Sequence, residues 1–225
     1  MQFRLPIASA ALTALALGLA AAPSPLLPSP PAQAQAQARD AGAEQFVQSE
    51  SRNALAILGD RDRSVGDKAR AFRGFVDRVA DVPRVTNFVL GKYARSITPD
   101  QHARFSSVFR EYASRVYESR LGEYRGETFQ VTGSVVRKPG DVIVNSVVSG
   151  GHLDKPIPVM WRVINAGAGW RVVDVQVSGV WLAITEQQDF VSTVDNAHGD
   201  IDALITQLQR QLASGEVTGG RKHDR

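Results

Sequence analysis

The sequence has no cysteine among its 225 residues. Disulfide bonds and thiolate metal sites are therefore excluded, and the chain must be held together by an ordinary packed core. Histidine is also scarce. None of the four histidines lies at metal-ligand spacing from another histidine or a carboxylate on a shared helical face, so we expect no metal site.

The motifs of common enzyme chemistry are missing. The chain has no G-x-S-x-G nucleophile elbow, no phosphate-binding Walker loop, no H-E-x-x-H zinc motif and no G-x-G-x-x-G dinucleotide fingerprint. These absences argue against serine-nucleophile, nucleotide-dependent and zinc-dependent activities. We therefore expect a protein that is not an enzyme and has no cofactor.

A strong charge of one sign is lacking too. The 26 lysines and arginines and the 23 aspartates and glutamates leave a formal net charge of +3, and the charges are interspersed along the chain. Nucleic-acid-binding surfaces need clustered cations. We expect no nucleic-acid partner.

The longest apolar run lies at the N-terminus. Arg4 precedes an Ala- and Leu-rich run over residues 7–22, a Pro-rich stretch follows, and small-x-small triplets lie between Ala32 and Ala38. This order is typical of a cleavable export signal, and the lack of a following cysteine excludes a lipoprotein anchor. The expected organisation is a signal peptide with a Pro/Ala/Gln-rich segment over 1–38, a single domain over 39–213 and a flexible tail over 214–225.

Helical periodicity dominates the first part of the expected domain. The clearest helix start is Thr98-Pro99-Asp100-Gln101, in which Thr98 suits the N-cap, Pro99 the first helical position and Gln101 the reciprocal position of a capping box. A second start of this kind spans residues 64–67. Apolar side chains follow both starts at helical spacing.

After Gly122 the apolar period changes from 3.6 to 2, which indicates strands. Four strands are predicted, over 127–138, 141–149, 156–165 and 170–184. Short turns between consecutive strands predict an antiparallel meander. The predicted apolar faces are Phe129, Val131 and Val135; Val142, Val144 and Val148; Ile157, Val159, Trp161 and Val163; and Val173, Val175, Val177 and Trp181.

Helical patterns return over 187–194 and 201–212. Helices, then a meander, then helices predict an α+β fold. We expect a curved antiparallel sheet of about four to five strands, packed against N- and C-terminal helices, with an apolar cleft between the layers.

Asp174 lies within the last predicted strand, where aspartate is uncommon. It could act as a general base in an apolar pocket, or it could be a structural carboxylate that is hydrogen-bonded or paired with an arginine. The structural interpretation is favoured, because a strand carboxylate needs such partners to offset its cost.

Several segments, taken in order, resemble the MlaC family of toluene-tolerance proteins. They are FVLGKY at 88–93, TPDQ at 98–101 followed by Phe105 and Phe109, the stretch 117–124, WRVVDV at 170–175 and GV at 179–180. The resemblance covers about residues 46 to 212. One departure is Trp181, where the family commonly has a small polar residue such as serine.

The resemblance implies a periplasmic lipid carrier. Such a protein holds phospholipid acyl chains between a curved sheet and helices, so phospholipid is cargo and no cofactor is needed. The implied partners are an inner-membrane ABC transporter complex with a substrate-gating domain and an outer-membrane lipoprotein complex. A hopanoid-associated branch of the same family provides an alternative cargo.

We expect the lipid tails to contact apolar side chains on both layers. The candidates, inferred from the predicted faces and the family fold, are Phe75, Val79, Phe88, Phe109, Tyr112, Val144, Val159, Trp161, Val175, Val177 and Trp181.

Two other functions stay open. An enzyme would need Asp174 to point into the cavity beside a second polar group. A partner-binding module with a solid core would have no internal cavity beyond a few water-sized voids, because the same residue types fill cores and line pockets.

Overall fold

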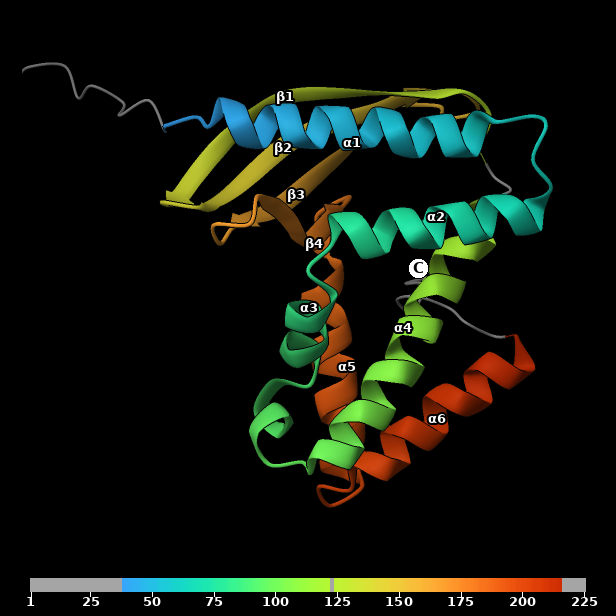
Figure 1. The fold of residues 1–225 in the computed structure, drawn as a ribbon, viewed down its shortest axis with the longest axis vertical. Helices are drawn as coiled ribbons and strands as arrows, with labels where there is room; N and C mark the ends of the chain where they lie inside the picture. Colours follow the sequence, from blue (N-terminus) through green and yellow to red (C-terminus); the bar gives the residue numbers. More distant parts are fainter. Residues whose placement is uncertain (1–37, 122–123, 216–225) are drawn as a thin grey trace, which may run out of the picture. The chain divides into compact units, whose positions relative to one another are not determined.

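The computed structural model describes residues 38–121 and 124–215. Within these residues, four α-helices and a short 3-10 helix come first, and five strands and two further helices follow (Figure 1). The elements are α1 (Ala41–Gly59), α2 (Val65–Val79), α3 (Val82–Val89), η1 (Gly91–Arg95), α4 (Pro99–Leu121), β1 (Glu127–Lys138), β2 (Asp141–Gly150), β3 (Ile157–Asn165), β4 (Trp170–Val177), β5 (Val180–Trp181), α5 (Leu182–Asn196) and α6 (Ile201–Ser214).

The predicted α+β class and antiparallel meander are confirmed. The five strands form one sheet in the order β1-β2-β3-β4-β5, and every neighbouring pair is antiparallel. The predicted export signal and most of the predicted tail lie outside the described residues.

Both predicted helix starts are capped as expected. The amide of Gln101 donates to Thr98 Oγ1 over 3.2 Å, and Thr98 N donates back to Gln101 Oε1 over 3.0 Å. At the start of α2, Asp67 N donates to Ser64 Oγ over 3.1 Å. Each cap satisfies a donor that the first helical turn leaves without a partner.

Register shifts in β1 and β4 interrupt the strict alternation that the sequence predicts. In β1, Val131 pairs with Ser146 and Gly133 pairs with Asn145, so one residue of β1 is extra. Because directly opposite residues share a face of the sheet, Ser134 takes the place predicted for Val135. The assignment of Val135 to the apolar face is therefore wrong.

Another bulge lies in β4. Arg162 pairs with Asp174 and Val163 with Val172, which leaves Val173 as the extra residue. Val172 and Val175 consequently lie on one face, although the sequence predicts opposite faces for them. The bulge therefore changes which side chains of β4 share a face with those of β2 and β3.

The last predicted strand is also too long. β4 ends at Val177, and Ser178 (φ 51°) and Gly179 (φ 88°) turn the chain back before the two residues of β5. Consecutive positive φ angles make a tight hairpin turn. Trp181 therefore lies opposite Gln176 at the start of α5 and does not extend the face of β4.

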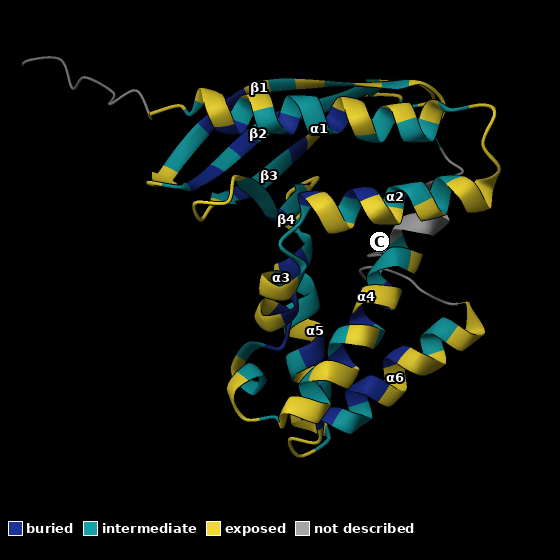
Figure 2. Cartoon of the chain, viewed as in Figure 1, coloured by how far each residue is buried: buried dark blue, intermediate teal, exposed yellow. Residues whose placement is uncertain are grey.

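Two apolar cores hold the described part of the chain. In the first, α1 lies along β1 and β2 (Figure 1) and buries Ala43 and Val47 against Val142, Val144 and Val163 of the sheet. In the second, α3, α4, α5 and α6 pack together around aromatic side chains, including Phe105 and Phe190. Figure 2 shows buried positions gathered where α4, α5 and α6 face one another.

The link between α2 and α3 joins the helical core to the sheet. Asp81 N donates to Val172 O over 2.9 Å, and Ala80 forms a parallel bridge with Val172. Asp81 then caps α3, because its carboxylate accepts from Arg84 N over 3.1 Å. This junction brings α2 and α3 beside β4.

Candidate functional site

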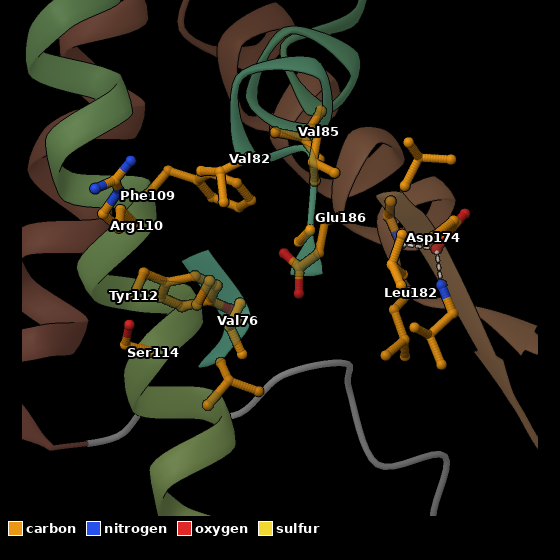
Figure 3. Close-up of a pocket in the computed structure, with 18 of the residues that line it drawn as sticks. Val76, Val82, Val85, Phe109, Arg110, Tyr112, Ser114, Asp174, Leu182 and Glu186 are labelled. Atoms are coloured by element: carbon orange, nitrogen blue, oxygen red, sulfur yellow. Dashed lines mark hydrogen bonds between the residues drawn. The ribbon is translucent and has the colours of Figure 1, made fainter. Parts of the chain in front are cut away.

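A cavity of about 420 Å³ lies among α2, α3, α4, α5 and the last two strands (Figure 3). The strands β1, β2 and β3 contribute no lining residue. The cleft thus lies between the helices and one end of the sheet, while α1 packs on β1 and β2. A cavity of this size contradicts the solid-core alternative.

Helical spacing explains why the walls are apolar. On α2, Ala69, Phe72 and Val76 line the cavity at i, i+3 and i+7. On α4 the same face begins at Phe109 and continues through Tyr112, Ala113 and Val116. Residues at these intervals lie on one side of a helix, so each helix presents a continuous apolar stripe.

The bulged strand forms the opposite wall. Because of the bulge, the consecutive residues from Val172 to Val175 all line the cavity, and Val177 follows. Val180 of β5 and Leu182 of α5 continue this wall. A regular strand would expose only alternate side chains to one side.

Asp174 lines the cavity, but its carboxylate is engaged by the backbone. Asp174 Oδ1 accepts from Ala183 N over 2.9 Å and from Val175 N over 2.8 Å. The N-cap residue of α5, Trp181, makes no side-chain cap. Asp174 thus caps α5 from the neighbouring strand, which agrees with the structural interpretation of this residue.

The environment of Asp174 acts on its pKa in two directions. Burial raises the pKa, while the two amide donors and the positive charge of Arg162 act to lower it, and the net shift is upward. The amide N–H groups donate to the ionised carboxylate and stabilise it. Protonation of Asp174 would therefore weaken the cap at the start of α5.

We expect Asp174→Ala to lower the free energy of unfolding by roughly 1–3 kcal/mol, because Ala183 N–H would be left buried without an acceptor. Urea unfolding at pH 7 measures this loss. Asp174→Asn keeps an oxygen of the same shape and should lose clearly less. Equal losses for the two variants would contradict the capping role.

Glu186 is a charged lining residue that the sequence analysis missed, as it also missed Phe72 and Val76 of α2. It comes from α5, lies one helical turn after Leu182 and one before the buried Phe190, and lines the cavity. Burial raises the pKa of Glu186 to about 7, with a further contribution from the nearby negative charge of Asp189. The available signal was a glutamate in the apolar stripe of a helix, between Ala183 and Phe190.

Charged groups on α2 and α4 complete the lining. Arg110 Nη1 lies 3.8 Å from Asp77 Oδ1, and both side chains are about half exposed. Arg73 lies on the same side of α2 and also lines the cavity. Exposed pairs of this kind contribute little to stability, but they surround the apolar walls with polar groups.

Four of the predicted contact residues line the cavity: Phe109, Tyr112, Val175 and Val177. The other seven lie outside its lining. They are Phe75, Val79, Phe88, Val144, Val159, Trp161 and Trp181.

Trp181 lies opposite Gln176, as described above, and the positions of the other six follow from the packing. Val144 and Trp161 belong to the core beneath α1, where Trp161 Nε1 donates to Ser146 Oγ over 2.9 Å. Val159 lies on that same face of β3. Phe75 and Val79 are buried on α2, whereas Phe88 on α3 is exposed. The prediction used the whole face of the sheet, but α1 occupies most of it.

No helix in the described residues is long and apolar enough to cross a membrane. Within the same residues, no cluster of three or more histidine, cysteine, aspartate or glutamate side chains is placed to hold a metal ion.

Comparison with known proteins identifies a matching family. The family model described as MlaC protein matches residues 48–210. The toluene tolerance protein ttg2D of Pseudomonas putida is 26% identical over 175 residues, which cover 76% of this chain and 81% of that relative.

Two further matches concern proteins named for phospholipids. The intermembrane phospholipid transport system binding protein MlaC of Haemophilus influenzae is 28% identical over 130 residues, and the match spans 56% of this chain and 59% of the relative. A solved structure of a phospholipid-binding protein from Ralstonia solanacearum, in complex with a phospholipid, has a TM-score of 0.70 and 25% identity. It matches 78% of this chain and 99% of its own.

Proposed function

The chain belongs to the MlaC protein family, and on this premise we propose that it is a lipid carrier that binds phospholipid. The observation that carries the proposal is the apolar cavity of about 420 Å³ among α2, α3, α4, α5 and β4. Its walls suit acyl chains, and two of the three proteins compared above are named for phospholipids.

The energetics support binding through the tails. Transfer of a methylene group from water to an apolar site contributes roughly 0.8 kcal/mol. About ten buried methylenes would therefore outweigh the cost of fixing one chain, without any bond to the headgroup. The tail contacts that we propose are Phe109, Tyr112, Val175 and Val177, together with Phe72 and Val76 of α2.

The location and the partners of the carrier form part of the same proposal. We infer a periplasmic protein that exchanges lipid with an inner-membrane ABC transporter complex and an outer-membrane lipoprotein complex. We propose no catalytic role for the cavity, since the carboxylate of Asp174 is used to cap α5. The bound phospholipid is cargo, and we propose no cofactor.

Lipid extraction tests the proposal directly. The protein is purified from a bacterial periplasm without detergent and analysed by native mass spectrometry and by lipid extraction. We expect a phospholipid to copurify and to survive gel filtration. Recovery of protein without lipid, also after incubation with phospholipid vesicles, would contradict the proposal. A polycyclic lipid in place of phospholipid would favour the hopanoid-associated alternative.

A further inference from the structure

Glu186 places a carboxyl group inside a cavity that is otherwise mostly apolar. Figure 3 shows Glu186 projecting between Tyr112 of α4 on one side and Asp174 and Leu182 on the other. Within the described residues, the carboxyl group of Glu186 has no hydrogen bond and no ion pair. The residue is only partly buried, so water that enters the empty cavity can solvate its carboxylate.

The neighbouring elements do not supply a counter-charge. From α4, Tyr112 faces the cavity, and its pKa is raised first by burial and then by the negative charges of Glu186 and Asp189. From β4, Asp174 adds a second carboxylate, which the start of α5 already holds. The lining residues of α3 and β5 are valines.

The remaining charged groups lie on α2 and α4. Asp77 and Arg110 pair with each other at 3.8 Å. Arg73 also lines the cavity. Within its own helix, the negative charge of Asp189 raises the pKa of Glu186, because a like charge disfavours ionisation.

We propose that Glu186 couples cargo binding to proton uptake, so that the loaded protein carries this side chain as a neutral carboxylic acid. This inference rests on the proposed lipid-binding function. An acyl chain that fills the cavity displaces the water that solvates the carboxylate. Ionised Glu186 would then be unpaired in an apolar site, which costs far more than the neutral acid.

The direction of the pH effect follows from linkage. Glu186 of the empty cavity titrates near pH 7, as noted above, and displacement of water raises that value further. Well below pH 7, Glu186 is protonated in both the empty and the loaded protein, so the affinity for cargo is highest and does not change with pH. Above it, the affinity falls by up to about tenfold per pH unit, because one proton is taken up per bound lipid. Reciprocally, ionisation of Glu186 favours release of the cargo.

The test uses dioctanoyl phosphatidylcholine, a soluble lipid whose headgroup keeps its charge state between pH 5.5 and 8.5. Its affinity for the full chain is measured by calorimetry across this range. We expect a constant affinity below about pH 6, about half of that affinity near pH 7 and a loss of roughly tenfold from the low-pH affinity at pH 8. Calorimetry in buffers of different ionisation enthalpy should report uptake of close to one proton at pH 8.

Three variants assign the effect to this side chain. Glu186→Gln keeps the size but cannot ionise, so its affinity should stay near the low-pH value at every pH. Asp189→Asn removes the like charge, so the loss of affinity should begin at a lower pH. Glu111→Gln changes an exposed residue of α4 that does not line the cavity, and it should behave as wild type.

The outcomes separate this inference from the proposed function. Failure of wild type to bind the lipid at any pH contradicts both. Binding with the same pH profile in wild type and Glu186→Gln contradicts the inference alone, and so does binding without proton uptake at pH 8. None of His102, His152 and His198 lines the cavity, so a pH dependence that persists in Glu186→Gln would arise outside the cavity.

Discussion

Val175→Glu should release the bound lipid and leave the protein folded. Val175 lies on β4 in the wall of the cavity and is only partly buried. In the empty cavity, water can solvate the new carboxylate, so the fold tolerates it. With an acyl chain in place the charge would be unpaired, and the cost of several kcal/mol corresponds to at least about a 100-fold loss of affinity. Copurified lipid and the thermal midpoint are the two measurements.

The sheet supplies a matched control for this substitution. Val175 pairs with Trp161, and Trp161 pairs in turn with Val144, so Val144 lies in the same row and on the same face. Val144, however, is fully buried beneath α1. Val144→Glu should therefore cost more than about 4 kcal/mol and unfold the protein. Unfolding of both variants would mean that Val175 is a core residue, and lipid retention by folded Val175→Glu would exclude the cavity as the site.

Phe190→Ala should cause the largest loss of stability among substitutions in the helical core. The ring of Phe190 on α5 meets three rings of α4 edge-on: Phe105 and Phe109 at centroid distances of 5.9 Å and Tyr112 at 6.1 Å. Removal of a buried phenyl group leaves a void and costs about 3–5 kcal/mol. Lipid binding should weaken as well, because Phe109 and Tyr112 also line the cavity.

Urea unfolding of Phe190→Ala measures this loss. Val65→Ala serves as the control, since Val65 is 72% exposed at the start of α2 and its truncation should change the free energy of unfolding by less than about 0.5 kcal/mol. A loss below about 1 kcal/mol for Phe190→Ala would contradict a tightly packed helical core. A large loss for Val65→Ala would point to a contact outside the described part of the chain.

The predicted lipid-contact residues show which part of the cavity lining can be predicted from the sequence and which part cannot. Phe109 and Tyr112 could be predicted as lining residues, because a helix of known start fixes which side chains share its apolar stripe. Val144 and Trp161 belong to an equally apolar pattern, but α1 covers them. Alternation identifies an apolar face of a strand without indicating which element packs on it.

The bulge in β4 is a second limit. Strict alternation predicts that Val172 and Val175 face opposite sides, whereas the register with β3 places them on one side. A bulge depends on how the neighbouring strands pair, and the pattern of a single strand carries no sign of it. The same applies to Asp174, whose partner Ala183 N lies across the turn that follows β4.

By itself, the sequence determined the features that depend on neighbouring residues: the capped helix starts at Ser64 and Thr98, the order of helices and strands, and the α+β class. Each of these depends on spacings of two to four residues along the chain. Only the tertiary structure decided where the cavity lies, which valines line it and that Glu186 projects into it. These properties require side chains from α2, α3, α4, β4 and α5 to meet, and the space between elements depends on their packing rather than on the pattern of any one of them.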